Sequence, residues 1–243
     1  MTVELYHGEP GSNSLKVLQA IHEKGVRFDS HYINLSKFEQ HEPEFLKINP
    51  AGQVPVLVHD GRVVTESTII NEYIDRAFDG PPLRPSDPYD EAQMRIWTKF
   101  VDDVFRPSLS YLAWHRVIPG LASRLPEGEF EKRLERIPLK EKRDKWSLAA
   151  SGGFSSRELE TWRHQLKESI DRLENGLDGR EWLVAGSFSL ADIAMFSMAI
   201  GVPMSYPELM NNQRTPNAIG WIARMRARPG VAAALAMPNR NAA

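Results

Sequence analysis

A proline-interrupted segment near the start of the chain reads FLKINPAGQVPVLVHDG and spans residues 45–61. The dipeptide Asp60-Gly61 separates its apolar run at 54–59 from a second run at 62–65. Asp-Gly between apolar runs is a strong hairpin signal, because both residues tolerate the left-handed backbone of a tight turn. The segment therefore predicts two antiparallel strands joined by a two-residue turn.

Pro55 stands at the mouth of the first of these strands. Proline cannot donate a ladder hydrogen bond, so it is tolerated at the start of a strand, and an X–Pro bond can adopt the cis form there. Such a turn would leave the backbone N–H and C=O of Val54 free to pair with an extended peptide ligand, as an added strand.

Glu66 and Ser67 follow the hairpin, where a strand end meets the start of a helical pattern at 69–78. The backbone N–H and the hydroxyl of Ser67 would hold a carboxylate, with help from the helix dipole. The carboxylate of Glu66 would take an ammonium group. Together the two residues predict a site for an amino-acid head group.

Strand and helix signals also alternate before this segment. Residues 3–6 and 28–34 predict strands, and a helical stripe between 15 and 21 stops at Gly25. A short helix at 43–48 completes the order βαβ, short helix, ββα. The first two strands need a crossover connection, so we expect them to be parallel.

A proline-rich segment marks the end of this unit. Residues 79–88 contain four prolines, which cannot continue a helix. We therefore expect an α/β domain over residues 1–80, a linker over 81–88 and an all-helical domain over 89–243.

The second domain shows helical patterns and no strand pattern. Apolar residues between 94 and 112 predict one long helix. Thirteen of the nineteen residues at 127–145 are charged, which predicts a solvated helical excursion. A final helix pair is expected at 217–227 and 230–237.

Two helix starts in this domain follow the capping-box pattern. Ser155 precedes Glu158 by three residues, and Ser189 precedes Asp192 in the same way. Each side chain would satisfy a backbone N–H that has no partner within its helix.

Composition excludes several classes of chemistry. The chain has no cysteine, so disulfides, thiolate zinc ligands and a cysteine nucleophile are impossible, and any reacting thiol must come from a ligand. The net charge of −2 points to neither nucleic acid nor an anionic membrane. No segment reaches the ~20 apolar residues of a membrane helix. The N-terminus lacks a signal-peptide pattern, so we expect a cytoplasmic protein. The histidines are scattered and cysteine is absent, so we expect no metal site.

The run INPAGQVPVL, followed by DG and ESTII, resembles the glutathione-binding motif of the glutathione S-transferase superfamily. The order of the domains and the box at Ser189 are similar to that family as well. The resemblance implies a thioredoxin-like first domain, glutathione as cosubstrate, and a homodimer. The resemblance assigns a role to matching positions of this sequence. Val54, in the Val54-Pro55 dipeptide, would pair with the cysteinyl backbone of glutathione. Glu66 and Ser67 would hold its γ-glutamyl group. Residues at the glycyl end or along the peptide backbone would be Gln40, His41 and Gln53.

The family activates the thiol with Tyr, Ser or Cys near the start of its first helix. A hydroxyl donating to the sulfur at a helix N-terminus lowers the thiol pKa. Ser14 is our first candidate, and Ser12 is the second because its spacing to Lys16 resembles the Ser-to-Arg spacing of theta-like members. Asn13 is the third, and simple capping of the helix is the alternative role for all three. Tyr6 lies within a strand and is expected to be a core aromatic.

A closer resemblance is to the bacterial lignin β-etherases. It rests on GSNSLK, on SKFEQHEPEFLKINPAGQVPVLVHDGRVVTEST and on PSDPYDEAQMRIWTKFVDD. The resemblance implies an α-keto β-aryl ether as substrate, a small aromatic compound. The thiolate of glutathione would attack Cβ, which the ketone activates, and expel a phenolate such as guaiacol. A generic glutathione transferase and a non-catalytic binding module are the two alternatives; the second predicts a degraded glutathione site.

The acceptor site is expected between the domains, where aromatic rings need flat apolar walls with a few polar groups. Ordinary helical core packing is the alternative for each candidate, and His115 would polarise the ketone or the leaving phenolate. The candidate wall residues are Tyr111, Trp114, His115, Trp146, Met204 and Tyr206.

Overall fold

The computed structural model describes residues 1–9 and 12–237. Gly11 of the predicted activating loop and residues 238–243 of the predicted helical domain lie outside the described residues. The first domain consists of β1 (Val3–His7), α1 (Ser14–Glu23), β2 (Asp29–Tyr32), η1 (Leu35–Lys37), η2 (Glu39–His41), α2 (Pro43–Ile48), β3 (Val56–His59), β4 (Arg62–Val64) and α3 (Ser67–Ala77).

The four strands form one sheet in the order β2-β1-β3-β4. Strands β1 and β2 are parallel, and β3 pairs antiparallel with both β1 and β4, as the sequence predicted. Asp60 and Gly61 both have positive φ, 47° and 76°, which is the backbone of a tight hairpin turn. The Val54–Pro55 peptide bond is cis.

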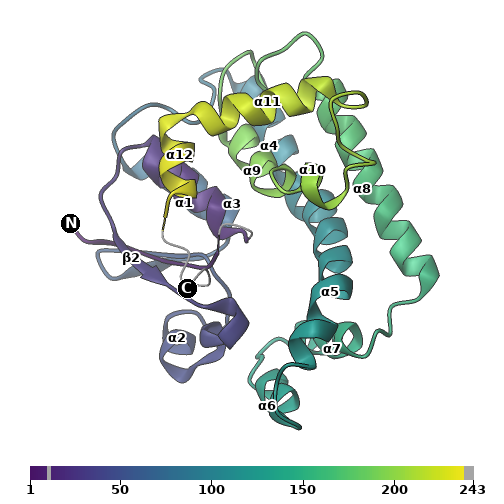
Figure 1. Cartoon of the computed structure of the whole chain (residues 1–243). Coiled ribbons are helices and arrows are strands. Elements are labelled where there is room, and N and C mark those ends of the chain that lie inside the picture. Colours follow the sequence, from purple (N-terminus) through teal and green to yellow (C-terminus); the bar gives the residue numbers. More distant parts are fainter. Residues whose placement is uncertain (10–11, 238–243) are drawn as a thin grey trace.

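Helices α1 and α3 pack on one face of the sheet, and α2 lies on the other side (Figure 1). The core between them holds fully buried aliphatic side chains from α1, β1, β3 and α3, among them Leu5, Leu18, Leu57 and Ile70. Burying such side chains is the main favourable term in folding. The Val54–Pro55 turn precedes β3 and the start of α3 follows β4, so the antiparallel pair places both at the same end of the sheet.

All regular elements in the described part of the second domain are helices, joined by turns and one isolated bridge between Val184 and Ser187. Its elements are α4 (Pro88–Phe100), η3 (Val101–Phe105), α5 (Arg106–Ala122), α6 (Glu129–Glu135), α7 (Lys140–Ala150), α8 (Ser156–Gly176), α9 (Leu190–Ala199), α10 (Val202–Ser205), α11 (Pro216–Ala227) and α12 (Pro229–Leu235). The predicted thioredoxin-like sheet followed by a helical domain is confirmed. None of the helices in the described part is long and apolar enough to cross a membrane.

Helix α9 forms the centre of the helical domain, because all ten of its residues are buried. Both predicted capping boxes are present, at Ser155 with Glu158 and at Ser189 with Asp192. Asp192 also accepts hydrogen bonds from the Trp221 ring N–H at 2.9 Å and from a backbone N–H. Burial raises the pKa of this carboxyl to about 6, although these hydrogen bonds oppose the shift.

The predicted long helix between 94 and 112 is present as part of a continuous helical run from Pro88 to Ala122, but the sequence did not predict the π-helical turn inside it. A π-helical turn, η3, separates α4 from α5 and brings Asp102 toward the first domain. A π turn adds one residue to the helical repeat. The apolar residues keep helical spacing on both sides of so short an insertion, so the sequence pattern did not reveal the π-helical turn.

The segment 127–145 is helical, as the sequence predicted, but it is less exposed to solvent than its charge indicates. It folds into α6 and the first half of α7, with Phe130, Leu134 and Ile137 buried. They form a second apolar cluster with Phe38 of the first domain. Most of the charged residues of these helices are exposed, whereas Lys142 lines a cavity between the domains, and the apolar residues pack the segment against the first domain.

Candidate active site

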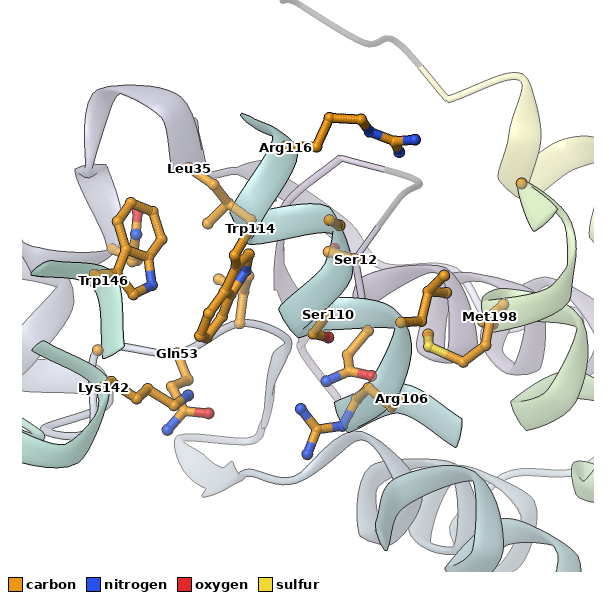
Figure 2. Close-up of a pocket in the computed structure, with 18 of the residues that line it drawn as sticks. Ser12, Leu35, Gln53, Arg106, Ser110, Trp114, Arg116, Lys142, Trp146 and Met198 are labelled. Carbon is orange, nitrogen blue, oxygen red and sulfur yellow. The ribbon is translucent and has the colours of Figure 1, made fainter. Parts of the chain in front are cut away.

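A cavity of about 470 Å³ lies between the two domains. The first domain lines it with Ser12, Asn13, Leu35, Gln40, His41, Gly52, Gln53 and Val54. Helices α5 and α7 and the segment before α7 contribute Arg106, Leu109, Ser110, Ala113, Trp114, Arg116, Ile137, Lys142 and Trp146. Helices α9 and α10 and the turn between them contribute Ser197, Met198, Ile200, Gly201 and Ser205. Figure 2 shows these side chains converging from both domains.

The start of α1 places the three predicted activating residues differently. Ser14 is fully buried, and its Oγ accepts a hydrogen bond from the Gly8 N–H at 2.8 Å. Ser12 lines the cavity, but its hydroxyl donates to the Glu9 carbonyl at 2.7 Å. Asn13 lines the cavity at the N-cap position, makes no capping hydrogen bond, and has a buried Oδ1 without a partner. The carboxamide of Asn13 is therefore the least committed of the three polar groups.

Tyr6 is not the core aromatic that the sequence predicted. Its ring stacks on His31 with centroids 4.4 Å apart, and its hydroxyl donates to Glu4 at 3.1 Å. The residue is only partly buried, and the Phe45 ring of α2 lies 6.1 Å from its ring. It does not line the cavity.

Gln40, His41, Gln53 and Val54 all line the cavity. Gln40 and His41 are both buried in the turn η2. Burial, together with the charges of Arg136 and Lys142, lowers the pKa of His41 to about 4. This ring is therefore neutral at pH 7.

The loop that carries Gln53 and Val54 is fixed by Asn49. The Asn49 carboxamide donates to the Gln53 carbonyl at 2.8 Å and accepts from the Ala51 N–H at 3.1 Å. Gly52 has φ +61°, and a side chain there would meet the His41 ring at 2.7 Å. The loop therefore needs glycine at this position to approach His41 so closely.

Glu66 and Ser67 lie at the start of α3, outside the residues that line the cavity. Glu66 has a positive φ of 65°, which is uncommon for a residue with a side chain. Ser67 is the first residue of α3 and is buried. Pro55 also lies outside the lining.

A partly buried ion pair and a hydrogen bond hold α1 and the start of α3 against the helical domain. The Lys16 ammonium lies 2.6 Å from Oδ1 of Asp102, and the Thr68 hydroxyl donates to Oδ2 of Asp102 at 2.6 Å. Lys16 is fully buried, and this burial lowers its pKa even though Asp102 opposes the shift. Sequence reasoning missed Asp102, since 86 residues separate it from Lys16.

Trp114 and Trp146 are the two predicted wall residues that line the cavity. Their rings lie 6.0 Å apart at an interplanar angle of 54°, one on α5 and the other on α7. Aromatic pairs at such distances attract each other in tilted arrangements. They give the cavity a rigid apolar wall (Figure 2).

The other four predicted wall residues lie outside the cavity lining. Tyr111 stacks on Trp162 with centroids 4.5 Å apart and receives a hydrogen bond from Lys145. His115 lies near Phe154, and its Nδ1 has no partner. Tyr206 is buried beside Arg116, whereas the Met204 side chain is 86% exposed. Helical packing, not the cavity, thus accounts for Tyr111 and Tyr206.

Sequence reasoning also missed the charged residues of the cavity. Arg106, Arg116 and Lys142 all line it, and all three come from the helical domain. Burial and the charge of Arg106 lower the pKa of Lys142 to about 8. Lys142 precedes Trp146 by four residues, so the two share a face of α7. Once Trp146 is a candidate wall residue, this four-residue spacing is the sequence signal that could have identified Lys142.

Comparisons with known proteins agree with this architecture. Residues 1–76 match the family model "Glutathione S-transferase, N-terminal domain" and residues 143–229 match "Glutathione S-transferase, C-terminal domain". Protein LigF of Sphingobium sp. (strain NBRC 103272 / SYK-6) is 41% identical over 237 residues, covering 95% of this chain and 92% of LigF. A probable glutathione S-transferase of Nicotiana tabacum is 27% identical over 216 residues, covering 85% of this chain and 75% of the relative.

The structural comparison gives the same result. The crystal structure of the β-etherase LigF from Sphingobium sp. strain SYK-6 matches with a TM-score of 0.92 and 40% identity. The match covers 96% of this chain and 98% of that chain. The resemblance that the sequence motifs indicated is thereby confirmed.

Proposed function

Because the chain belongs to the glutathione S-transferase family, we propose that it cleaves β-aryl ethers with glutathione as cosubstrate. The observation that carries this proposal is the likeness to the β-etherase LigF, which extends over nearly the whole chain. The substrates would be lignin-derived α-keto β-O-4 compounds, which are small aromatic ethers.

Glutathione would lie along the first-domain side of the cavity. The backbone of Val54, after the loop held by Asn49, would pair with the cysteinyl unit. Glu66 and Ser67 at the start of α3 would hold the γ-glutamyl group, where the helix N-terminus favours a carboxylate. The other end of the peptide would reach Gln40, His41 and Gln53.

The thiol would lie at the start of α1, within reach of Ser12 and Asn13. Ser14, our first candidate from the sequence, already accepts from the Gly8 N–H and lies behind the lining. Asn13 lines the cavity and makes no capping hydrogen bond, so its carboxamide N–H is the donor to the sulfur in this proposal. A hydrogen bond to the charged thiolate lowers the thiol pKa.

The reaction would be a displacement at carbon. The thiolate sulfur forms a bond to Cβ, the bond from Cβ to the aryl ether oxygen breaks, and the phenolate leaves with that electron pair. The adjacent ketone makes Cβ more electrophilic. The protein would supply proximity between two bound molecules and a lowered thiol pKa.

The acceptor would bind between α5, α7 and α9. Trp114 and Trp146 offer flat apolar surfaces, and Met198 faces them across the cavity (Figure 2). A cavity of about 470 Å³ is in the range that small-molecule sites occupy. This part of the cavity would set the choice of substrate.

A homodimer is part of the proposal. Exposed apolar side chains gather on three neighbouring elements, with Val63 on β4, Ile69 on α3 and Ile96 on α4. The Arg95–Glu72 pair at 2.9 Å joins α4 to α3 and places these elements side by side. Exposed apolar patches of this kind mark interaction surfaces. Light scattering coupled to size exclusion would report twice the monomer mass.

The activity is tested with a racemic α-keto β-guaiacyl ether, with and without glutathione. The proposal predicts guaiacol release that requires glutathione and stops near half conversion if one enantiomer is used. A matched reaction with a generic aryl halide tests the competing function. Turnover of the halide without ether cleavage would mark a generic glutathione transferase. Absence of both, with thermal stabilisation by glutathione, would mark a binding module.

A further inference from the structure

The charges that face the cavity are distributed unequally between the domains. The lining that the first domain contributes carries no charge at pH 7, because His41 is neutral there. The three cations of the lining, Arg106, Arg116 and Lys142, belong to the helical domain. Glutathione carries a carboxylate at each end, and the first-domain lining offers no cationic side chain to either of them.

The helix that carries Lys142 is docked on the loop that carries Gln40 and His41. The Phe38 ring, fully buried in this loop, lies 5.1 Å from the Trp146 ring of α7. The Arg136–Glu42 pair at 2.6 Å adds a second link between the same parts of the chain. Lys142 shares a face of α7 with Trp146 and therefore points into the cavity beside this loop. Figure 2 shows its side chain extending toward Gln53.

Lys142 has no carboxylate within ion-pair distance among the described residues. Glu141, its neighbour on α7, pairs with Lys145 at 2.9 Å. Glu66 acts on Lys142 only through space, and the cation Arg106 acts against it. An ammonium that is partly removed from water and unpaired is costly, and a bound anion would relieve that cost.

We propose that Lys142 binds the glycyl carboxylate of glutathione. This inference rests on glutathione being the cosubstrate. The γ-glutamyl end already has Ser67, the N-terminus of α3 and the carboxylate of Glu66. The glycyl end has only the neutral side chains of Gln40, His41 and Gln53 from the first domain. Two cations lower the pKa of His41, first Arg136 and then Lys142. Arg136 is paired with Glu42 and lies outside the lining, so Lys142 is the lining cation that acts on this loop.

The cosubstrate site then spans both domains. The segment formed by α6 and α7 supplies the ammonium from one side, and the loop from Asn49 to Val54 supplies backbone contacts from the other. Glutathione binding and the placement of the Trp146 wall become linked, because one face of α7 serves both. Lys142 acts as a binding residue and takes no part in bond breaking.

The test is a comparison of two ligands by isothermal titration calorimetry. One is glutathione and the other is its C-terminal amide, γ-glutamylcysteinylglycinamide, which lacks only the glycyl charge. We expect the wild type to prefer glutathione by about tenfold, which corresponds to about 1.4 kcal/mol, because only glutathione offers a charged partner to the ammonium. Lys142→Met should abolish most of this preference, and Lys142→Arg should retain part of it.

Lys140→Met is the matched control. Lys140 lies on the same helix, is exposed, and pairs with Asp144 at 2.5 Å. This variant should keep the wild-type preference. Circular dichroism and thermal unfolding establish that each variant is folded.

Three results would overturn the proposal. Lys142→Met could keep the full preference for glutathione, or it could lose affinity equally for both ligands. The wild type could fail to bind glutathione at all, which would overturn the cosubstrate as well. Neither ligand is an aryl ether, so failure of ether cleavage alone leaves the binding result fully interpretable.

Discussion

Lys16 and Asp102 join the two domains through a partly buried ion pair, with Nζ of Lys16 2.6 Å from Oδ1 of Asp102. Lys16 belongs to the first helix and is fully buried, whereas Asp102 lies in the π-helical turn between α4 and α5. The second carboxylate oxygen accepts from Thr68, next to the start of α3. One carboxylate therefore fixes two helices of the first domain against the helical domain.

Asp102→Asn should destabilise the protein by about 3 kcal/mol, because it leaves the ammonium of Lys16 buried without a counter-charge. Urea denaturation measures the loss. Asp103→Asn is the control, since Asp103 is exposed and pairs with the exposed Lys99. Its effect should stay within about 1 kcal/mol. Equal stability of Asp102→Asn and the wild type would contradict the assigned role of the pair.

Asn13→Ala should raise the thiol pKa of bound glutathione by about one to two units, which is the value of one hydrogen bond to a charged group. The ultraviolet difference spectrum of the thiolate, followed against pH, measures that pKa. Ser12→Ala serves as a comparison at the same end of the cavity. If Asn13→Ala leaves the pKa unchanged and Ser12→Ala raises it, the hydroxyl is the donor.

Ser14→Ala should act mainly on stability. Its Oγ is the acceptor for the buried Gly8 N–H, so its removal leaves that N–H unsatisfied. The expected cost is about 1–3 kcal/mol. Urea denaturation and the thiol pKa are measured on the same preparation. A normal stability with a raised thiol pKa would restore Ser14 as the activating residue.

His41 should make stability depend on pH. Its pKa is about 4 in the folded protein against an ordinary value of 6.5. Between these values the unfolded state binds more protons than the folded state, so the free energy of unfolding rises with pH. Lowering the pH from 7 to 4 should remove up to about 3 kcal/mol through this residue.

The measurement is urea denaturation at several pH values for the wild type and for His41→Gln. The variant should show a smaller dependence across this window. His164→Gln is the control, because His164 is exposed and lies on the outer face of α8. A pH dependence that His41→Gln leaves unchanged would assign it to other groups.

Phe38→Ala should loosen the docking of α6 and α7. Phe38 is fully buried and contacts Phe130 and Trp146 across the domains. Emptying such a site costs about 3–5 kcal/mol. Hydrogen exchange should accelerate in α7 while the amides of the sheet stay protected. The control is Leu139→Ala, at a partly exposed position before α7. Unchanged protection of α7 would show that other contacts hold the excursion.

Local signals predicted much of the fold. The Asp60-Gly61 turn and the capping box at Ser189 are decided by residues within a few positions of each other, so the sequence alone reveals them. The π-helical turn and the pairing of Lys16 with Asp102 depend on contacts that are distant in sequence. No local pattern specifies such a pairing.

The candidate site was predicted unevenly for a similar reason. The motif around Val54 is local, and the structure brings Val54 together with Gln40, His41 and Gln53. The wall was harder, because an aromatic residue on a helix packs equally well into a core or a cavity. Met204 illustrates this, since it lies in the short helix α10 and is exposed to solvent. The spacing of Phe130, Leu134 and Ile137 was a readable signal that the charged residues around it obscured.

The most direct test of the central claim is the stoichiometry of a single turnover with an α-keto β-guaiacyl ether. Guaiacol, free thiol and the product are quantified in the same quenched samples by mass spectrometry. Displacement by the thiolate predicts one guaiacol released for each glutathione consumed, with the sulfur bonded to the former ether carbon. Guaiacol released without loss of thiol, or without that carbon–sulfur bond, would contradict the account.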